Sequence, residues 1–270
     1  SDSVKHLNEL KVPENRLPVQ QYLDPTFAGT LRVSDISFTY PKEDYPIIQN
    51  FSLTLKRGQK AALIGPSGAG KSTILQLILG DLKPNQGTVT LDRLNVLKLQ
   101  RERSKLFSVL NQEPFLFNTT IYENLKMANP DATTDQMMEI LEKVQLADFV
   151  NSLPKGLDTE VAEAGARFSG GQKERLALAR VLLQDTPIVL LDEPTVGLDP
   201  LTEQKLLNLV FEVLKNKTVV WVTHHLQGVK YMNEVLFFKD GKVTMQGNPH
   251  ELFKHNEHFH QLYLMDQGLI

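Results

Sequence analysis

A glycine-rich segment, Gly65-Pro-Ser-Gly-Ala-Gly-Lys-Ser72, contains residue types that can grip a chain of phosphates. It follows the pattern G-x4-G-K-[ST], between an apolar strand expected at Gln59–Ile64 and a helix expected at Ser72–Leu79. The glycines let backbone N–H groups approach an anion without a Cβ in the way, and the helix N-terminus adds partial positive charge. Lys71 is expected to reach the β- and γ-phosphates, and the Ser72 hydroxyl to ligate Mg²⁺. The segment predicts a nucleoside-triphosphate site that includes Gly65, Pro66, Ser67, Gly68, Ala69, Gly70, Lys71, Ser72 and Thr73.

Two neighbouring acids, Asp192 and Glu193, follow the apolar run Ile188–Leu191. Four apolar residues in a row predict a buried central strand, and open α/β sheets bind ligands at the carboxyl ends of such strands. Asp192 is therefore expected to hold Mg²⁺. Glu193 is placed to polarise an attacking water as a general base, so the predicted reaction is hydrolysis of the triphosphate.

A third segment, Ser169-Gly-Gly-Gln172, opens a helix expected over Ser169–Leu183. The plain structural interpretation is a capping box formed by Ser169 and Gln172. Two glycines inside the first helical turn, however, cost about 1 kcal/mol each relative to alanine. That cost favours a backbone exposed for close approach, with free N–H groups directed at an anion.

Taken together, these segments resemble those of ABC ATPases, over about residues 30–250 of the chain. Ser-Gly-Gly-Gln opening a helix before the acid-bearing strand looks like the signature motif of that family, and Ser169 follows Lys71 by 98 residues, a similar spacing. The resemblance implies an ATP-binding and ATP-hydrolysing domain that works with Mg²⁺. It also implies that two such domains pair head to tail, as a homodimer or a paralogous heterodimer, so that Ser169, Gly170 and Gly171 act on the partner's nucleotide. Gln172 is expected among the nucleotide-binding residues as well.

Four further residues take roles from the same resemblance. Tyr40, 25 residues before Gly65, resembles the aromatic residue that stacks on adenine. Gln112 resembles the glutamine that coordinates Mg²⁺ and senses the membrane domain. Asp199 belongs to the segment Val196–Asp199, which resembles the D-loop. His224 resembles the switch histidine that contacts the γ-phosphate, whereas strand alternation is expected to turn His225 to the opposite side. The expected catalytic residues are thus Lys71, Gln112, Glu193 and His224, and the expected metal ligands are Ser72, Gln112 and Asp192.

Two positions depart from the family pattern. Phe168 stands where the signature usually has leucine, and Val196-Gly197 replaces the usual Ser-Ala of the D-loop. The second change removes a hydroxyl that takes part in communication across the dimer.

The order of expected elements predicts an α/β fold, the P-loop ABC ATPase fold. Strands that alternate with helices imply a mainly parallel core sheet, and the alternating segments Leu31–Tyr40 and Phe51–Leu55 imply an N-terminal antiparallel β subdomain. In the last third, a helix at Thr202–Lys215 and a strand at Thr218–Val222 precede a hairpin of Val235–Phe238 with Val243–Gln246. The predicted organisation is an arm at 1–28, an ATPase domain at 29–250 with a helical subdomain at about 113–185, and a C-terminal helical tail at 251–270.

Composition narrows the functional classes. A net charge of −3 and a pI near 6.2 indicate no nucleic-acid partner, and the absence of cysteine excludes disulfides and thiolate metal sites. No apolar stretch approaches the roughly 18 residues needed to span a bilayer, so the chain by itself is expected to be soluble, at the cytoplasmic side of the cell membrane. The start at Ser1 fits either an excised piece of a longer polypeptide or simple removal of an initiator Met. Together with the proline-bearing arm, the resemblance to exporters implies a transmembrane domain fused upstream.

The kind of ABC protein is a narrower question. The segment Gln112–Leu125 resembles the exporter version of this region, and Phe115–Phe117 there line either a groove for an intracellular coupling helix or ordinary subdomain core. Glu193–Asp199 and Thr223–Gly228 resemble the CydC/CydD-type half-exporters of cytochrome bd assembly, which are thought to export small thiols. The alternatives are an importer subunit, a chromosome-maintenance or DNA-repair ATPase, and a module that binds ATP only to dimerise or regulate. The 98-residue spacing between Lys71 and Ser169 and the acidic pI argue against a chromosome-maintenance or DNA-repair ATPase. The presence of both Glu193 and His224 argues against a module that only binds ATP.

Overall fold

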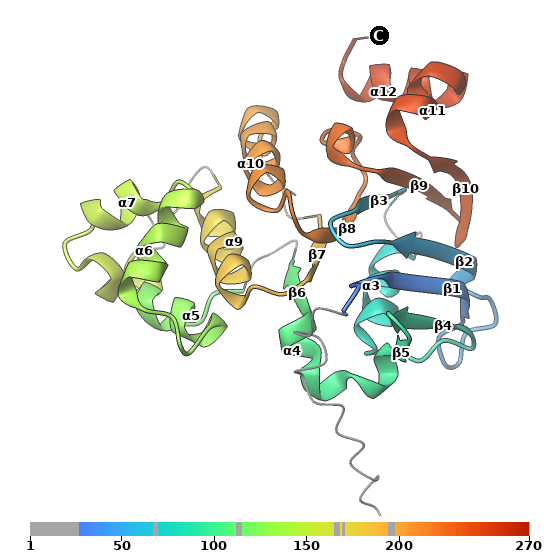
Figure 1. The fold of residues 1–270 in the computed structure, drawn as a ribbon. Coiled ribbons are helices and arrows are strands. Elements are labelled where there is room, and N and C mark those ends of the chain that lie inside the picture. The colour runs from blue at the N-terminus through green and yellow to red at the C-terminus, as the bar shows by residue number, and fades with distance from the viewer. Residues whose placement is uncertain are drawn as a thin grey trace, which may run out of the picture.

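The computed structural model describes residues 27–66, 70–111, 115–164, 168, 171–193 and 198–269, and within them the strands form two sheets (Figure 1). A four-stranded antiparallel sheet has the order β2-β1-β4-β5, and a six-stranded core sheet has the order β10-β9-β3-β8-β7-β6. The antiparallel sheet comprises β1 (Leu31–Phe38), β2 (Ile48–Leu55), β4 (Gln86–Leu91) and β5 (Leu94–Asn95). The core sheet comprises β3 (Lys60–Ile64), β6 (Phe107–Leu110), β7 (Ile188–Asp192), β8 (Thr218–Thr223), β9 (Glu234–Lys239) and β10 (Lys242–Gly247).

Every pairing in the core sheet is parallel except that of β9 with β10 at one edge. All residues of β3 and β8 are buried, as expected for strands covered on both faces. Ile64 pairs with Thr223 and Asp192 pairs with Val222, so the carboxyl ends of three neighbouring strands meet at one edge. This edge is where the sequence places the glycine-rich loop, the two acids and His224.

Two apolar clusters cover the two faces of the core sheet. Successive residues of β3 alternate between them, since Ala62 and Ile64 join one cluster and Ala61 and Leu63 the other. One cluster joins α3 (Lys71–Leu79) to the antiparallel sheet, and the other joins α9 (Gln172–Gln184) and α10 (Pro200–Val213) to the helical region. The remaining helices are η1 (Val96–Lys98), η2 (Gln100–Glu102), α4 (Arg103–Leu106), α5 (Ile121–Ala128), α6 (Thr134–Lys143), α7 (Ala147–Ser152), η3 (Gly156–Asp158), α8 (Val161–Ala164), η4 (Val229–Tyr231), α11 (Pro249–His255) and α12 (Glu257–Asp266).

The helices α5, α6 and α7 gather around α9 on the opposite side of the molecule from the antiparallel sheet (Figure 1). Local sequence sets their boundaries: Thr120 caps α5, and Thr133 forms a capping box with Gln136 at the start of α6. The predicted fold class is confirmed, with an antiparallel β unit, a mainly parallel core sheet and a helical region. None of the helices in the described parts of the chain is long and apolar enough to cross a membrane.

Candidate nucleotide-binding site

Lys71 lies at the start of α3, directly beyond the carboxyl end of β3, and its side chain is only 4% exposed. Its Nζ donates to the carbonyl oxygens of Gly65 and Thr223, the latter at 3.1 Å, and lies 3.5 Å from Glu193 Oε1. Burial lowers the pKa of Lys71, while the charges of Glu193 and Asp192 oppose that shift. The ammonium group is therefore held among acceptors at the edge of the sheet where a triphosphate is expected.

The two ends of the glycine-rich loop lie tightly against the sheets. Gly70 has a φ of 97°, and a Cβ there would lie 2.6 Å from Ile48 Cδ1. A Cβ on Gly65 would lie 2.5 Å from the carbonyl oxygen of Phe238. Only glycine fits these two positions, so the backbone at both ends of the loop lies close to the sheets. Pro66 follows Gly65 and is exposed, while Ser67, Gly68 and Ala69 lie outside the described residues.

The expected metal ligands Ser72 and Asp192 come together from α3 and β7. Their Oγ and Oδ1 atoms lie 3.5 Å apart, and both are hard oxygen donors of the kind that Mg²⁺ prefers. Burial raises the pKa of Asp192 and the neighbouring charge of Glu193 adds to the rise, while Ser72 and Lys71 oppose it. The residues present fit a divalent cation, although Gln112 lies outside the described residues.

Glu193 has an unusual backbone conformation for a glutamate, with a φ of 44°. The left-handed region costs a non-glycine residue about 1–2 kcal/mol and persists where the surroundings enforce it, often at functional sites. Here the Glu193 N–H donates to the carbonyl of Val222 at 2.9 Å, and Oε1 forms a 2.8 Å hydrogen bond with His224 Nδ1. The Glu193 carboxylate is thereby held between His224 and Lys71.

The side chains of the adjacent residues His224 and His225 do not point to opposite sides, as strand alternation predicted. β8 ends at Thr223, so strand alternation no longer applies to His224 and His225, and their ring centroids lie 3.9 Å apart. They differ instead in their partners, because His224 contacts Glu193 whereas His225 Nδ1 lies 3.7 Å from Asp266 Oδ1. The contact with Glu193 distinguishes His224 as the histidine at the candidate catalytic centre.

Tyr40 reaches the same region from the loop after β1. Its hydroxyl forms a 2.8 Å hydrogen bond with Thr73 Oγ1, in the first turn of α3, and its ring packs edge-on against Phe38. The half-buried ring therefore lies beside the helix that follows the glycine-rich loop.

The expected signature segment begins its helix later than the sequence pattern suggested. α9 starts at Gln172, and Gly171 is its N-cap with a φ of 87°, so Gly171 does not lie inside the first helical turn. The left-handed backbone explains a glycine at this position, while Ser169 and Gly170 lie outside the described residues. The arm residues 1–26 and the D-loop positions Val196 and Gly197 lie outside them as well.

Asp199 caps α10 in the structure. Its carboxylate accepts hydrogen bonds from the hydroxyl and the N–H of Thr202, at 2.6 and 3.0 Å, which lower the pKa of Asp199. A role of Asp199 in contacting nucleotide stays a prediction.

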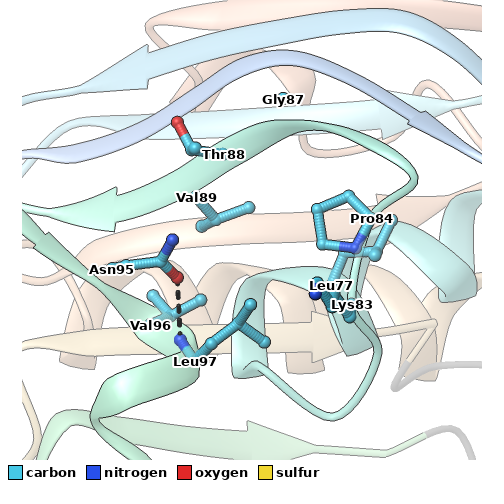
Figure 2. Close-up of a pocket in the computed structure, with 9 residues that line it drawn as sticks. All are labelled: Leu77, Lys83, Pro84, Gly87, Thr88, Val89, Asn95, Val96 and Leu97. Carbon is cyan, nitrogen blue, oxygen red and sulfur yellow. Dashed lines mark hydrogen bonds between the residues drawn. The ribbon is translucent and has the colours of Figure 1, made fainter.

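The hydrogen bond from Lys71 to Thr223 could not be predicted from the residue types. The Thr223 acceptor for Lys71 is a backbone carbonyl, placed by the β3–β8 pairing rather than by its side chain. A separate hollow of about 230 Å³ lies at the far end of α3, between β4 and η1, and contains none of the expected nucleotide contacts (Figure 2).

The family model of the ABC transporter matches residues 48–196, which is more than half of the chain. The chain therefore belongs to the ABC transporter family and is a nucleotide-binding domain that hydrolyses ATP. It is 48% identical over 237 residues to the glutathione/L-cysteine transport system ATP-binding/permease protein CydD of Bacillus subtilis (strain 168), covering 88% of this chain and 41% of that protein. It is also 37% identical over 243 residues to the mitochondrial iron-sulfur clusters transporter ATM1 of Kluyveromyces lactis, covering 88% of this chain and 34% of that protein.

A solved structure of a bacterial Atm1-family ABC exporter with ATP bound is similar in fold, with a TM-score of 0.79 and 29% sequence identity. The similarity covers 89% of this chain and 42% of that one. The chain thus spans about two fifths or less of the length of these relatives.

Proposed function

We propose that this domain is the ATP-driven motor of an exporter and acts at the cytoplasmic side of a membrane. The observation that carries the proposal is the position of Glu193, whose Oε1 lies 2.8 Å from His224 Nδ1 and 3.5 Å from Lys71 Nζ. A carboxylate held there can accept a proton from an attacking water. Lys71 neutralises charge on the β- and γ-phosphates, and His224 orients the catalytic carboxylate.

Mg²⁺ is proposed to bind at Ser72 and Asp192, with Gln112 as a third ligand. When bound, the cation supplies charge neutralisation for the triphosphate oxygens. The Asp192 carboxylate must be ionised to hold it, which links metal binding to the raised pKa of that group.

The proposed working unit is a head-to-tail pair of such domains, either identical or paralogous. Support comes from Gly171, whose left-handed backbone leads directly into the N-terminus of α9. Together with Ser169, Gly170 and Gln172, this backbone is proposed to contact the nucleotide held by the partner's glycine-rich loop. Helix N-termini favour such anionic ligands.

The proposed contact with the membrane domain is a groove of about 1140 Å³ between α4, α5 and α9. Phe115 and Phe117 line it and are 68% and 38% exposed, so the alternative that these two rings are ordinary subdomain core is not favoured. Arg180 donates to the Phe115 carbonyl at 3.0 Å and its guanidinium lies 5.1 Å from the Phe117 ring centroid. Exposed aromatic rings positioned in this way suit an apolar face of a coupling helix from a fused transmembrane domain.

The cargo class that we propose for the complete protein is the small thiols. The 48% sequence identity with CydD supports this cargo class. The resemblance of Glu193–Asp199 and Thr223–Gly228 to CydC/CydD-type half-exporters supports it as well. The complete polypeptide in inside-out vesicles should accumulate cysteine or glutathione in an ATP-dependent manner. Accumulation of neither thiol would reject this cargo class without affecting the proposed motor.

The motor proposal is tested by Glu193→Gln, with Glu251→Gln as a matched control because Glu251 is exposed and its carboxylate lies beside His255 in α11. Glu193→Gln should keep ATP affinity, lose turnover and form an ATP-dependent dimer in light scattering. Glu251→Gln should hydrolyse ATP like the parent. Turnover of Glu193→Gln at the parent rate would show that Glu193 is not the base.

A further inference from the structure

The last residue of α12, Asp266, contacts the segment that carries His224 from a distance of 40 positions in sequence. Its Oδ2 accepts a hydrogen bond from the Leu226 N–H at 3.1 Å, and its Oδ1 lies 3.7 Å from His225 Nδ1. We call residues His224–Leu226 the switch loop. One carboxylate from the C-terminal helix therefore contacts two consecutive residues of this loop.

These contacts hold the backbone of the switch loop where β8 no longer does. Beyond Thr223 the sheet pairing ends, so the loop N–H groups need other acceptors. Thr223 Oγ1 accepts a hydrogen bond from the His225 N–H at 3.1 Å, and the Asp266 carboxylate accepts one from the Leu226 N–H. The Leu226 side chain is 5% exposed within the apolar cluster, so the loop is held at its far end by packing and by this hydrogen bond.

The position of Asp266 on its helix also needs an explanation. A negative charge at a helix C-terminus is disfavoured by the helix dipole, so the contacts with the loop N–H and with His225 compensate for an otherwise unfavourable site. The rest of α12 is fixed independently, because Phe259 is 1% exposed and its ring packs edge-on against Phe237 of β9. A helix anchored to the core sheet thus brings Asp266 to the loop.

We propose that Asp266 is a positioning residue for ATP hydrolysis. It fixes the Leu226 backbone and the neighbouring His225 ring, which packs against the ring of His224, and so sets how His224 meets Glu193. The inference rests on the proposed function of His224 as the residue that orients the catalytic carboxylate. It assigns the C-terminal helix a part in turnover, beyond its packing against the core.

The test compares Asp266→Ala and Asp266→Asn with Met265→Ala, a change of the adjacent residue whose side chain is 62% exposed. Asp266→Ala should lower kcat about tenfold, as expected for loss of a hydrogen bond to a charged group, and leave KM for ATP unchanged. Asp266→Asn keeps an oxygen that can accept from the Leu226 N–H, so its kcat should stay within about threefold of the parent. Hydrogen exchange of the Leu226 amide should accelerate in the alanine variant alone.

His224→Ala serves as the reference that separates the two proposals. If His224→Ala loses turnover while Asp266→Ala keeps the parent kcat, the positioning role of Asp266 is wrong and that of His224 stands. If His224→Ala keeps turnover, the proposed function of His224 fails and the inference fails with it. The positioning role of Asp266 would also be overturned if Asp266→Ala and Met265→Ala lowered kcat equally, or if Asp266→Asn lowered kcat as much as Asp266→Ala does.

Discussion

Two buried lysines on the same strand–loop–helix segment provide a test that separates stability from nucleotide binding. Lys60 and Lys71 are 5% and 4% exposed, and burial lowers the pKa of each. Lys60 lies at the start of β3, away from the candidate site, whereas Lys71 lies beyond its end, within the site. Methionine, which is similar in length and carries no charge, is the matched substitution at both positions.

Lys60→Met should reduce stability and leave ATP affinity unchanged. The Lys60 ammonium donates to the carbonyls of Gly58, Lys215 and Lys217 at 3.2, 2.9 and 3.1 Å, the last two just beyond α10. Hydrogen bonds from a charged donor contribute about 1.5–3 kcal/mol each, and relief of the buried charge offsets part of that sum. We expect a net loss of about 2–4 kcal/mol, or roughly 5–15 °C in melting temperature for a domain of this size.

Lys71→Met should differ from Lys60→Met in its effect on ATP binding. Loss of the ammonium group that faces the phosphates should remove about 3 kcal/mol or more of binding free energy, which weakens the Kd for ATP at least about 100-fold. The free energy of unfolding should also fall, by about 2–4 kcal/mol, because the hydrogen bonds to the Gly65 and Thr223 carbonyls and the contact with Glu193 are lost, while the burial cost of the charge disappears.

Urea unfolding followed by the fluorescence of Trp221 measures stability, since it is the one tryptophan of the chain and is 1% exposed. Calorimetric titration with ATP and Mg²⁺ measures affinity on the same samples. A Lys71→Met variant that binds ATP within threefold of the parent would refute the assignment of the phosphate site. A Lys60→Met variant that loses affinity as strongly as Lys71→Met would refute the argument that the two lysines act separately.

Two further substitutions test the metal and adenine contacts. The raised pKa of Asp192 means that folding stability falls as the pH rises from the ordinary aspartate value of about 3.9 through the raised value. Asp192→Asn should remove this pH dependence of stability in urea titrations across the same pH range, and the variant should be more stable than the parent at pH 7. It should nevertheless lose Mg²⁺-dependent turnover. Unchanged turnover would exclude Asp192 as a Mg²⁺ ligand. Tyr40→Ala should weaken ATP more than inorganic triphosphate, whereas Tyr40→Phe, which loses only the hydrogen bond to Thr73, should stay within about threefold for ATP. Equal weakening of both ligands by Tyr40→Ala would point to a structural role for the ring.

The parts of the site that could be predicted from sequence are those that depend on local order. The glycine pattern around Lys71 follows a strand and precedes a helix, and the acids Asp192 and Glu193 follow an apolar run. The structure confirms both arrangements, and Gly80 ends α3 in the left-handed conformation that is typical of a glycine C-cap. Hydrophobic periodicity and backbone preference act over a few residues, so these features are visible without knowledge of the fold.

The expectations that failed involve backbone geometry at the ends of elements. α9 begins at Gln172 rather than at Ser169, because Gly171 takes a left-handed backbone that interrupts the helical pattern. His224 and His225 lie on the same side, because β8 has already ended at Thr223. Residue types alone do not determine at which residue a regular element stops.

By itself the sequence determined the identity of the chemical groups: a cation after β3, two carboxylates at the end of β7 and a histidine after β8. Only the tertiary structure decided that Glu193 lies between Lys71 and His224, and that Asp266 from the other end of the chain contacts the switch loop. The physical reason is that these contacts depend on parallel strand register and on the packing of α12. Both are set by burial of apolar surface between segments that are far apart in sequence.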